Sequence, residues 1–226
     1  MRSLFFLTLL TVSLQVQAQR QGLWLNFQSG YGSSSISNGD RVSSFSSGVK
    51  PGPRYFMGLQ LGYMFDDHTG WFSGLSYSRY TWREEITTQL VNATLENRQN
   101  YIQIPLYVQF ATSKPGKPGA YFQVGVNANI LTNAISSLHD NGNGRTIIKD
   151  ESLKKAVKPF AILPFIGAGA YIPFSRSMHL EAGACFDYDF NDNMKRETKH
   201  KGNLYSISGR IALCFRISTR KNQAEL

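Results

Sequence analysis

Apolar runs long enough to cross a bilayer as a helix are absent from this sequence beyond its first eighteen residues. Charged residues make up only 17% of the chain, and the mean hydropathy is −0.27. The two cysteines form no zinc motif, and no phosphate-binding loop, dinucleotide fingerprint or nucleophile elbow occurs. These absences argue against a helical membrane protein, and they lead us to expect no metal and no cofactor.

What the chain does contain is aromatic side chains, at 13% of residues, together with abundant Gly, Ser, Asn and Gln. High aromatic content with a mean hydropathy near zero is typical of a chain in which apolar and polar residues alternate. The N-terminus reads as a secretory signal peptide, with Arg2 before a short apolar run from Leu4 to Leu14 and a cleavage site at residues 16–18. We therefore expect export and a mature chain that starts at Gln19.

Eight segments have strand character, with lengths near the 9–11 residues that a tilted transmembrane strand needs. They cover residues 21–31, 55–66, 71–83, 98–110, 119–131, 159–173, 178–190 and 203–218. Apolar and polar residues alternate with a period of two, so the rows containing Leu59, Val124 and Ile211 share one face of a sheet. The sixth segment shows no clean faces in either register, and its Pro164 and Pro173 predict a bulge or a strand end.

The composition of the two faces favours a membrane barrel over a soluble sheet. The polar face carries small residues, Gln and Asn, which suit the crowded lumen of a narrow barrel. The apolar face ends in aromatic residues, which suit the two bilayer interfaces: Tyr55, Phe65, Trp71, Tyr188 and Tyr205. The predicted fold class is all-β, an eight-stranded antiparallel up-and-down transmembrane β-barrel. The alternative is a soluble barrel of lipocalin type, whose apolar rows would face inward.

Connection lengths support the barrel independently. Long connections at residues 32–54, 84–97, 136–158 and 191–202 alternate with short ones at 66–70, 112–118 and 175–177. Short periplasmic turns and long outer loops give this order when both termini are periplasmic. We therefore expect a signal peptide over residues 1–18, an outer-membrane β-barrel domain over 19–218 and a polar tail over 219–226. The predicted location is the bacterial outer membrane.

The net charge of +9 is concentrated in the predicted outer loops. Because the chain is exported, we do not expect a nucleic-acid partner. Lys and Arg pair with phosphate, which lipopolysaccharide presents at that surface. Six loop residues are therefore candidates for lipopolysaccharide contact, with an ordinary solvated loop as the alternative: Lys149, Lys154, Lys155, Lys158, Lys195 and Arg196. The expected partners are outer-membrane lipid, lipopolysaccharide and proteins of the envelope.

Five charged residues fall on the polar face of the last two predicted strands: Glu181, Asp187, Asp189, Arg210 and Arg216. Side chains nearly fill an eight-stranded barrel, so a structural lumen network is favoured over a selective pore or a catalytic acid pair. The same face carries Cys185 and Cys214. A cross-strand disulfide would need their Cα atoms about 4.4–6.8 Å apart, and two buried thiols are the alternative.

An outer-membrane lipid-modifying enzyme on the same scaffold would need His, a hydroxyl and a carboxylate together at one rim. Ser177, His179 and Glu181 are close in sequence, but i±2 neighbours on a strand form no triad by themselves. We therefore predict that the protein is not an enzyme.

Residues 100–106, which read N-Y-I-Q-I-P-L, resemble the Y-I-x-I-P-L strand of PorT-like outer-membrane β-barrel proteins of Bacteroidota. The residues that carry the match are Tyr101, Ile102, Ile104, Pro105 and Leu106. Residues 164–169 and 58–63 are similar to two further strands of that family. The resemblance implies an eight-stranded outer-membrane barrel without an assigned activity, and for one branch a part in type IX secretion and gliding.

Overall fold

The computed structural model describes residues 22–38, 46–87, 92–113, 117–175, 177–190 and 202–217. The strands are β1 (Gly22–Asn38), β2 (Ser46–Met64), β3 (Thr69–Thr87), β4 (Asn92–Ala111), β5 (Gly119–Asp140), β6 (Thr146–Ser152), β7 (Phe160–Ser175), β8 (Met178–Tyr188) and β9 (Gly202–Ile217). Within these ranges no helix has both the length and the apolar character to cross a bilayer. The predicted signal peptide and the predicted C-terminal tail lie outside the described residues and stay predictions.

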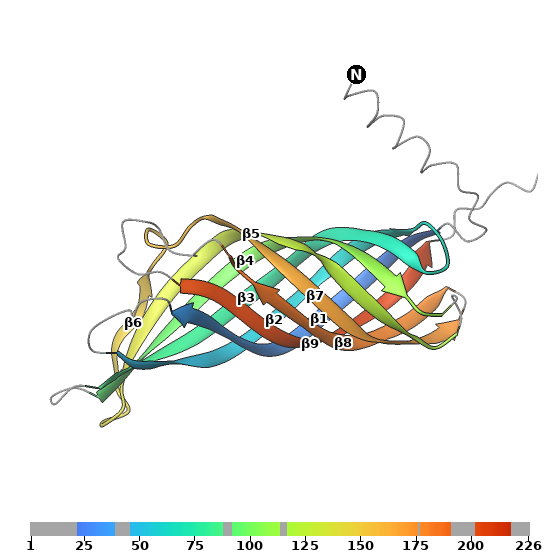
Figure 1. Cartoon of the computed structure of the whole chain (residues 1–226). Helices are drawn as coiled ribbons and strands as arrows, with labels where there is room; N and C mark the ends of the chain where they lie inside the picture. The colour runs from blue at the N-terminus through green and yellow to red at the C-terminus, as the bar shows by residue number, and fades with distance from the viewer. Residues whose placement is uncertain are drawn as a thin grey trace, which may run out of the picture.

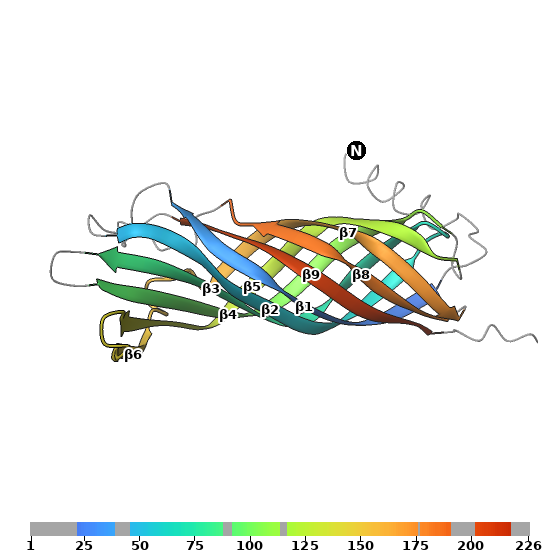
Figure 2. The same cartoon turned by 90° about the horizontal axis from the view of Figure 1, so that it is seen from below.

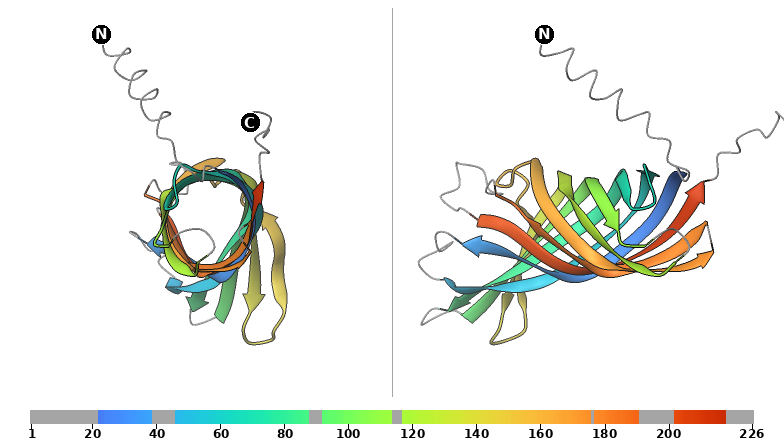
Figure 3. Two further views of the ribbon diagram at one scale, coloured as in Figure 1. Left: turned by 90° about the vertical axis from the view of Figure 1, so that its right-hand side faces the viewer. Right: turned by 45° about the vertical axis from the view of Figure 1, so that its right-hand side comes forward.

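Eight of the strands close into an antiparallel barrel (Figures 1 and 2). Neighbours in the ring follow chain order, except that β7 rather than β6 lies beside β5 along the barrel wall. The first strand pairs with the last from Leu23–Ile217 to Asn38–Gly202, so the ring seen end-on in Figure 3 is continuous. The predicted eight-stranded up-and-down barrel is confirmed.

The barrel has two unlike ends. At the turn end, β1 begins, β9 ends and the short connections after β2, β4 and β7 lie. At the outer end, β5 continues into a hairpin with β6, which projects from the barrel wall (Figure 3). Among the described strands, β6 pairs with β5 alone.

Apolar side chains cover the outside of the barrel. Leu59, Val124 and Ile211 are 48%, 43% and 59% exposed. On β2 the outward apolar row runs from Tyr55 to Phe65, about the length of strand that crosses a bilayer. A soluble protein does not expose so continuous an apolar surface. The lipocalin alternative is wrong, because it requires these rows to face inward.

The prediction that the sixth segment lacks clean faces is wrong. β7 alternates regularly, with Leu163 and Phe165 buried and Ile162 and Ile166 exposed. Both faces of this strand are apolar, and polarity therefore gave no sign of the alternation. The predicted bulge or strand end is confirmed at Pro173, where the β7–β8 register shifts before the strand ends at Ser175. Pro164 lies one residue beyond the last β7–β8 pair, Phe165–Asp187, so it interrupts nothing in that ladder.

The strands are longer, and the outer connections shorter, than the sequence suggested. β3, β4 and β5 contain 19, 20 and 22 residues, about twice what a bilayer crossing requires. The predicted loops at 32–54, 84–97 and 136–158 are therefore strand over much of their length. Their outer parts, residues 81–87, 92–98 and 135–140, project at the outer end of the barrel and are called the sheet extension (Figure 2).

Candidate functional site

The middle of the lumen holds an ion pair between β2 and β8. Arg54 Nη1 lies 2.5 Å from Asp187 Oδ2, and the side chains are 2% and 1% exposed. The guanidinium donates hydrogen bonds to Ser208 Oγ (3.0 Å) and to Tyr80 OH (3.1 Å). Asp187 also accepts a hydrogen bond from Ser206 Oγ (2.9 Å). Two buried charges are thus paired and given further polar partners, as charges in a barrel interior require.

A second ion pair lies closer to the turn end. Arg210 Nη2 of β9 is 3.1 Å from Glu181 Oε2 of β8, and both side chains are buried. Arg210 Nε donates to Gln28 Oε1 (2.9 Å), and Gln109 Nε2 donates to Glu181 Oε1 (2.8 Å). Gln123 Nε2 then donates to Gln109 Oε1 (2.7 Å). These contacts tie β1, β4, β5, β8 and β9 together across the lumen.

The lumen charges that the sequence predicted to be paired lie in two separate ion pairs. Glu181, Asp187, Asp189 and Arg210 are all buried, whereas the half-buried Arg216 lines a cavity at the turn end. Arg54 falls at the end of a predicted loop, so it was not among the predicted lumen residues. Arg54 and the lumen-facing Gln60 are an even number of positions apart on β2, so both side chains point to the same face. Extending the period of two from Gln60 toward the N-terminus would have placed Arg54 in the lumen.

An apolar plug fills the outer end of the barrel. Val157 and Leu163 are fully buried there with Tyr80 and Tyr101, and Leu153 packs against them. Residues 153–157 enter this cluster from the connection after β6. Their backbone is held by bonds such as Leu153 N to Ala134 O (2.9 Å). Aromatic and aliphatic packing therefore blocks the lumen between the buried ion pairs and the outer end of the barrel.

Two small cavities lie between described side chains of the lumen. One of about 30 Å³ lies beside Arg54 and Arg210, and one of about 40 Å³ lies at the turn end beside Trp24 and His179. Volumes of this size hold a few water molecules at most. Among the described residues, side chains therefore pack closely around these two cavities.

The cysteine pair proposed as a disulfide is not one. Both thiols are free and buried. In the β8–β9 register Cys214 lies opposite His179, whereas Cys185 lies opposite Ser208. The six-residue offset along the hairpin corresponds to about 20 Å, far beyond the reach of a disulfide.

The catalytic alternative requires a serine hydroxyl next to His179, and none of the described contacts of His179 is with a serine. Ser177 Oγ is hydrogen-bonded to Ser175 Oγ at 3.2 Å. His179 Nε2 lies 3.3 Å from Glu181 Oε1, and its ring packs against Trp24 at 4.8 Å. A carboxylate and an imidazole meet here without the hydroxyl that a hydrolytic triad needs.

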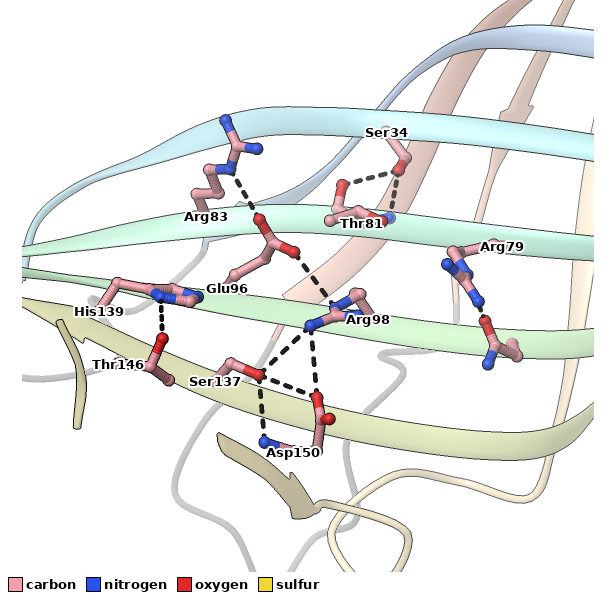
Figure 4. Close-up of polar contacts among 11 residues, drawn as sticks. Ser34, Arg79, Thr81, Arg83, Glu96, Arg98, Ser137, His139, Thr146 and Asp150 are labelled. Carbon is pink, nitrogen blue, oxygen red and sulfur yellow. Dashed lines mark hydrogen bonds and ion pairs between the residues drawn. The ribbon is translucent and has the colours of Figure 1, made fainter. Parts of the chain in front are cut away.

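Ion pairs also cross the outward face of the sheet extension (Figure 4). Glu96 of β4 lies between Arg83 of β3 (3.1 Å) and Arg98 (3.2 Å), and Arg98 is 3.4 Å from Asp150 of β6. Ser137 Oγ donates to Asp150 Oδ1 at 3.2 Å. Asp150 has a φ of 53°, a left-handed conformation that Asp tolerates better than most residues. This ladder joins the projecting hairpin to the barrel.

This ladder was not predicted, because residues 84–97 were expected to form a loop. Arg83, Glu96 and Arg98 share the outward parity of their strands, which is the signal that could have found them. The ladder lies just beyond the aromatic band, where Arg79 stacks 5.1 Å over Tyr55.

The basic residues proposed to contact lipopolysaccharide are placed only in part. Lys149 lies on β6, and Lys154 and Lys155 follow it in the segment that enters the plug; all three are exposed. Lys158 is half-buried and has an interaction of its own. Lys195 and Arg196 lie outside the described residues. The structure thus gathers the placed residues at the outer end, next to the hairpin.

The strand that carries the family motif has a specific role for its proline. Tyr101 is fully buried in the plug, whereas Ile102, Ile104 and Leu106 face outward. Pro105 faces the lumen opposite Asn127 of β5, and the β3–β4 ladder skips it between the pairs Ser73–Leu106 and Ser76–Gln103. A residue without an N–H interrupts a ladder in this way.

A closed barrel with an apolar outer band, aromatic ends and a filled polar lumen defines the class of small transmembrane β-barrels. Within that class, residues 15–195 match the family model described as Outer membrane protein beta-barrel domain. The chain belongs to this family. The chain matches no curated protein sequence.

Solved outer-membrane barrels have similar folds at low sequence identity. Neisserial surface protein A is 12% identical with a TM-score of 0.45, and 86% of this chain and 98% of that chain are covered. OprG of Pseudomonas aeruginosa is 11% identical with a TM-score of 0.49, covering 91% and 100%. Ail of Yersinia pestis is 13% identical with a TM-score of 0.40, covering 87% and 100%. At these identities the likeness concerns the fold alone.

Proposed function

We propose that this protein is a non-enzymatic, non-conducting outer-membrane anchor that presents its sheet extension and β5–β6 hairpin to lipid or protein partners of the envelope. The observation that carries the proposal is the contrast between the two regions. The lumen is closed by the Arg54–Asp187 pair and by the plug around Val157. The strands meanwhile continue well beyond the apolar band and end in an exposed hairpin.

A rigid support for that hairpin is consistent with a role in presentation. Paired strands have far less conformational freedom than loops, so a surface built on them loses less entropy when it binds. The hairpin is held by the β5–β6 pairs, and Arg98 of β4 also lies 3.4 Å from Asp150 of β6. Such a surface serves binding better than transport.

Conductance across a planar lipid bilayer tests the closed lumen. The purified, folded protein should give no channel steps at either polarity. A double Arg54→Ala, Asp187→Ala variant removes the central ion pair and should raise the leak current. Stable open steps from the unaltered protein would overturn the proposal of a closed anchor and favour a pore.

Lipopolysaccharide is the lipid partner that the charge distribution supports. Lys149, Lys154 and Lys155 are exposed at the outer end, and ammonium groups there can pair with lipid phosphates. A triple change of these residues to Gln should lower lipopolysaccharide retention during purification. Lys117→Gln, at the turn end, is the matched control. Unchanged retention in the triple variant would remove lipopolysaccharide from the proposal.

The narrower relationship to PorT-like proteins rests on the strand motif from Tyr101 to Leu106. It supports a part in a secretion apparatus as the protein role of the anchor. Co-purification of such an apparatus with the intact protein, lost when residues 146–152 are replaced by a short turn, would bear this role out. Recovery of the apparatus with the shortened protein would argue against the hairpin as its docking point.

A further inference from the structure

Three potential metal-ligand side chains meet inside the turn end of the barrel. His179 and Glu181 lie two positions apart on β8, so both face the lumen, and Cys214 of β9 lies directly opposite His179. One ligand atom from each of these residues lies within 4.8 Å of the others. His179 Nε2 and Glu181 Oε1 are already 3.3 Å apart, which is close to the separation of two ligands on one ion.

A fourth polar group completes the arrangement from the next strand. Asn26 of β1 lies directly opposite Cys214 in the β1–β9 register. Its side chain is 1% exposed, and neither its Oδ1 nor its Nδ2 has a hydrogen-bond partner. Asn26 and His179 line the same cavity of about 40 Å³. A buried amide without partners is costly, and a bound ion or its water would satisfy the oxygen.

We propose that His179, Glu181 and Cys214, with Asn26 as the fourth group, form a binding site for one Zn²⁺-class transition-metal ion. Imidazole nitrogen, thiolate sulfur and carboxylate oxygen are the three ligand types that Zn²⁺ uses in proteins. A thiolate ligand disfavours Ca²⁺ and Mg²⁺, which take oxygen ligands. Ligand separations near 3.5 Å around a tetrahedral ion require the thiol and the imidazole to move inward by about 1 Å.

The proposed site has two acidic ligands, and two guanidiniums lie near them: Arg210 Nη2 is 3.1 Å from Glu181 Oε2, and Arg216 lines the same cavity. Glu181 and the Cys214 thiolate contribute two negative charges, and the thiol proton leaves to solvent as the ion binds. Gln109 donates to Glu181 Oε1, which orients the carboxylate as supporting hydrogen bonds do in metal sites. Asp67, Ser113 and Ser175 line the same cavity at the turn end.

Cobalt titration of the full-length protein, purified from membranes in detergent, tests the site. Co²⁺ bound through a thiolate gives a near-ultraviolet sulfur-to-metal charge-transfer band, which no other ligand here can produce. We expect one Co²⁺ per chain, displaced by Zn²⁺. Cys214→Ser should abolish the band, and His179→Ala or Asn26→Ala should weaken binding by about tenfold or more.

Cys185→Ser is the matched control, because this second buried thiol lies at the level of the central ion pair and should leave the band unchanged. Folding of every variant is checked by its heat-dependent shift in gel mobility. The proposal is overturned if the folded unaltered protein shows no band at millimolar Co²⁺. It is also overturned if the band survives Cys214→Ser, or if it disappears in Cys185→Ser.

Discussion

The two shortest ion pairs between described side chains have the same separation and opposite surroundings. Arg54–Asp187 and Lys50–Glu85 each have an N–O distance of 2.5 Å. The first pair is almost fully buried, whereas the lysine and glutamate of the second are 62% and 35% exposed. Solvent screens the exposed charges, so breaking that pair should cost little. In the lumen, removing one charge leaves the other buried without compensation.

This contrast predicts unequal costs for two matched amide substitutions. Asp187→Asn should lower the free energy of unfolding by about 3–5 kcal/mol, and Glu85→Gln by about 1 kcal/mol or less. Urea titration of the protein folded in detergent, followed by Trp fluorescence, measures both. Equal losses would mean that Arg54 finds another partner or enough water in the adjacent 30 Å³ cavity.

At the scale of elements, the outer connection after β6 is a structural part of the barrel. Residues 153–157 carry Val157 into the apolar plug, and Leu131 N bonds to Pro159 O at 2.8 Å where the chain returns to β7. The β5–β6 hairpin and this plug are consecutive in the chain. A force that a partner applies to the hairpin would therefore be transmitted to the plug.

A charge placed inside the plug should release this segment. Val157→Asp buries a carboxylate among aromatic and aliphatic side chains without a partner. We expect trypsin to cleave after Lys154 or Lys155 at least about tenfold faster, because local opening exposes both bonds. Ile147→Asp on the exposed β6 is the control. Equal cleavage rates in the two variants would show that the segment is already open in solution.

At the scale of the whole molecule, the outer wall of the barrel faces two environments, lipid around the apolar band and water around the sheet extension. The outward face is apolar between the aromatic ends and charged on the sheet extension, where Glu96 and Arg98 lie. The lumen has the opposite distribution of polarity: it is polar at mid-depth and apolar in the plug at the outer end. A closed barrel can invert the usual arrangement in the membrane because its backbone groups are all paired between strands.

Charge on the outer wall should therefore have a cost that depends on depth. Leu59→Arg, at the middle of the apolar band, should destabilise the barrel by about 2–4 kcal/mol, and Tyr31→Arg, near its outer edge, by about 0–1 kcal/mol. Urea titration in phosphatidylcholine vesicles measures the difference. If the two changes cost the same, the apolar rows do not contact acyl chains.

The sequence determined the sheet's two faces, the barrel class and the short turns, because a strand's period of two is local and each strand displays it alone. It failed at β7, where both faces are apolar, and at the strand ends, where polar residues outside the membrane looked like loop. Only the tertiary structure decided that Arg54 meets Asp187, that the cysteines lie far apart, and that Cys214 faces His179 and Asn26. These contacts and separations depend on the register between strands, which is set by bulges and by closure of the whole ring.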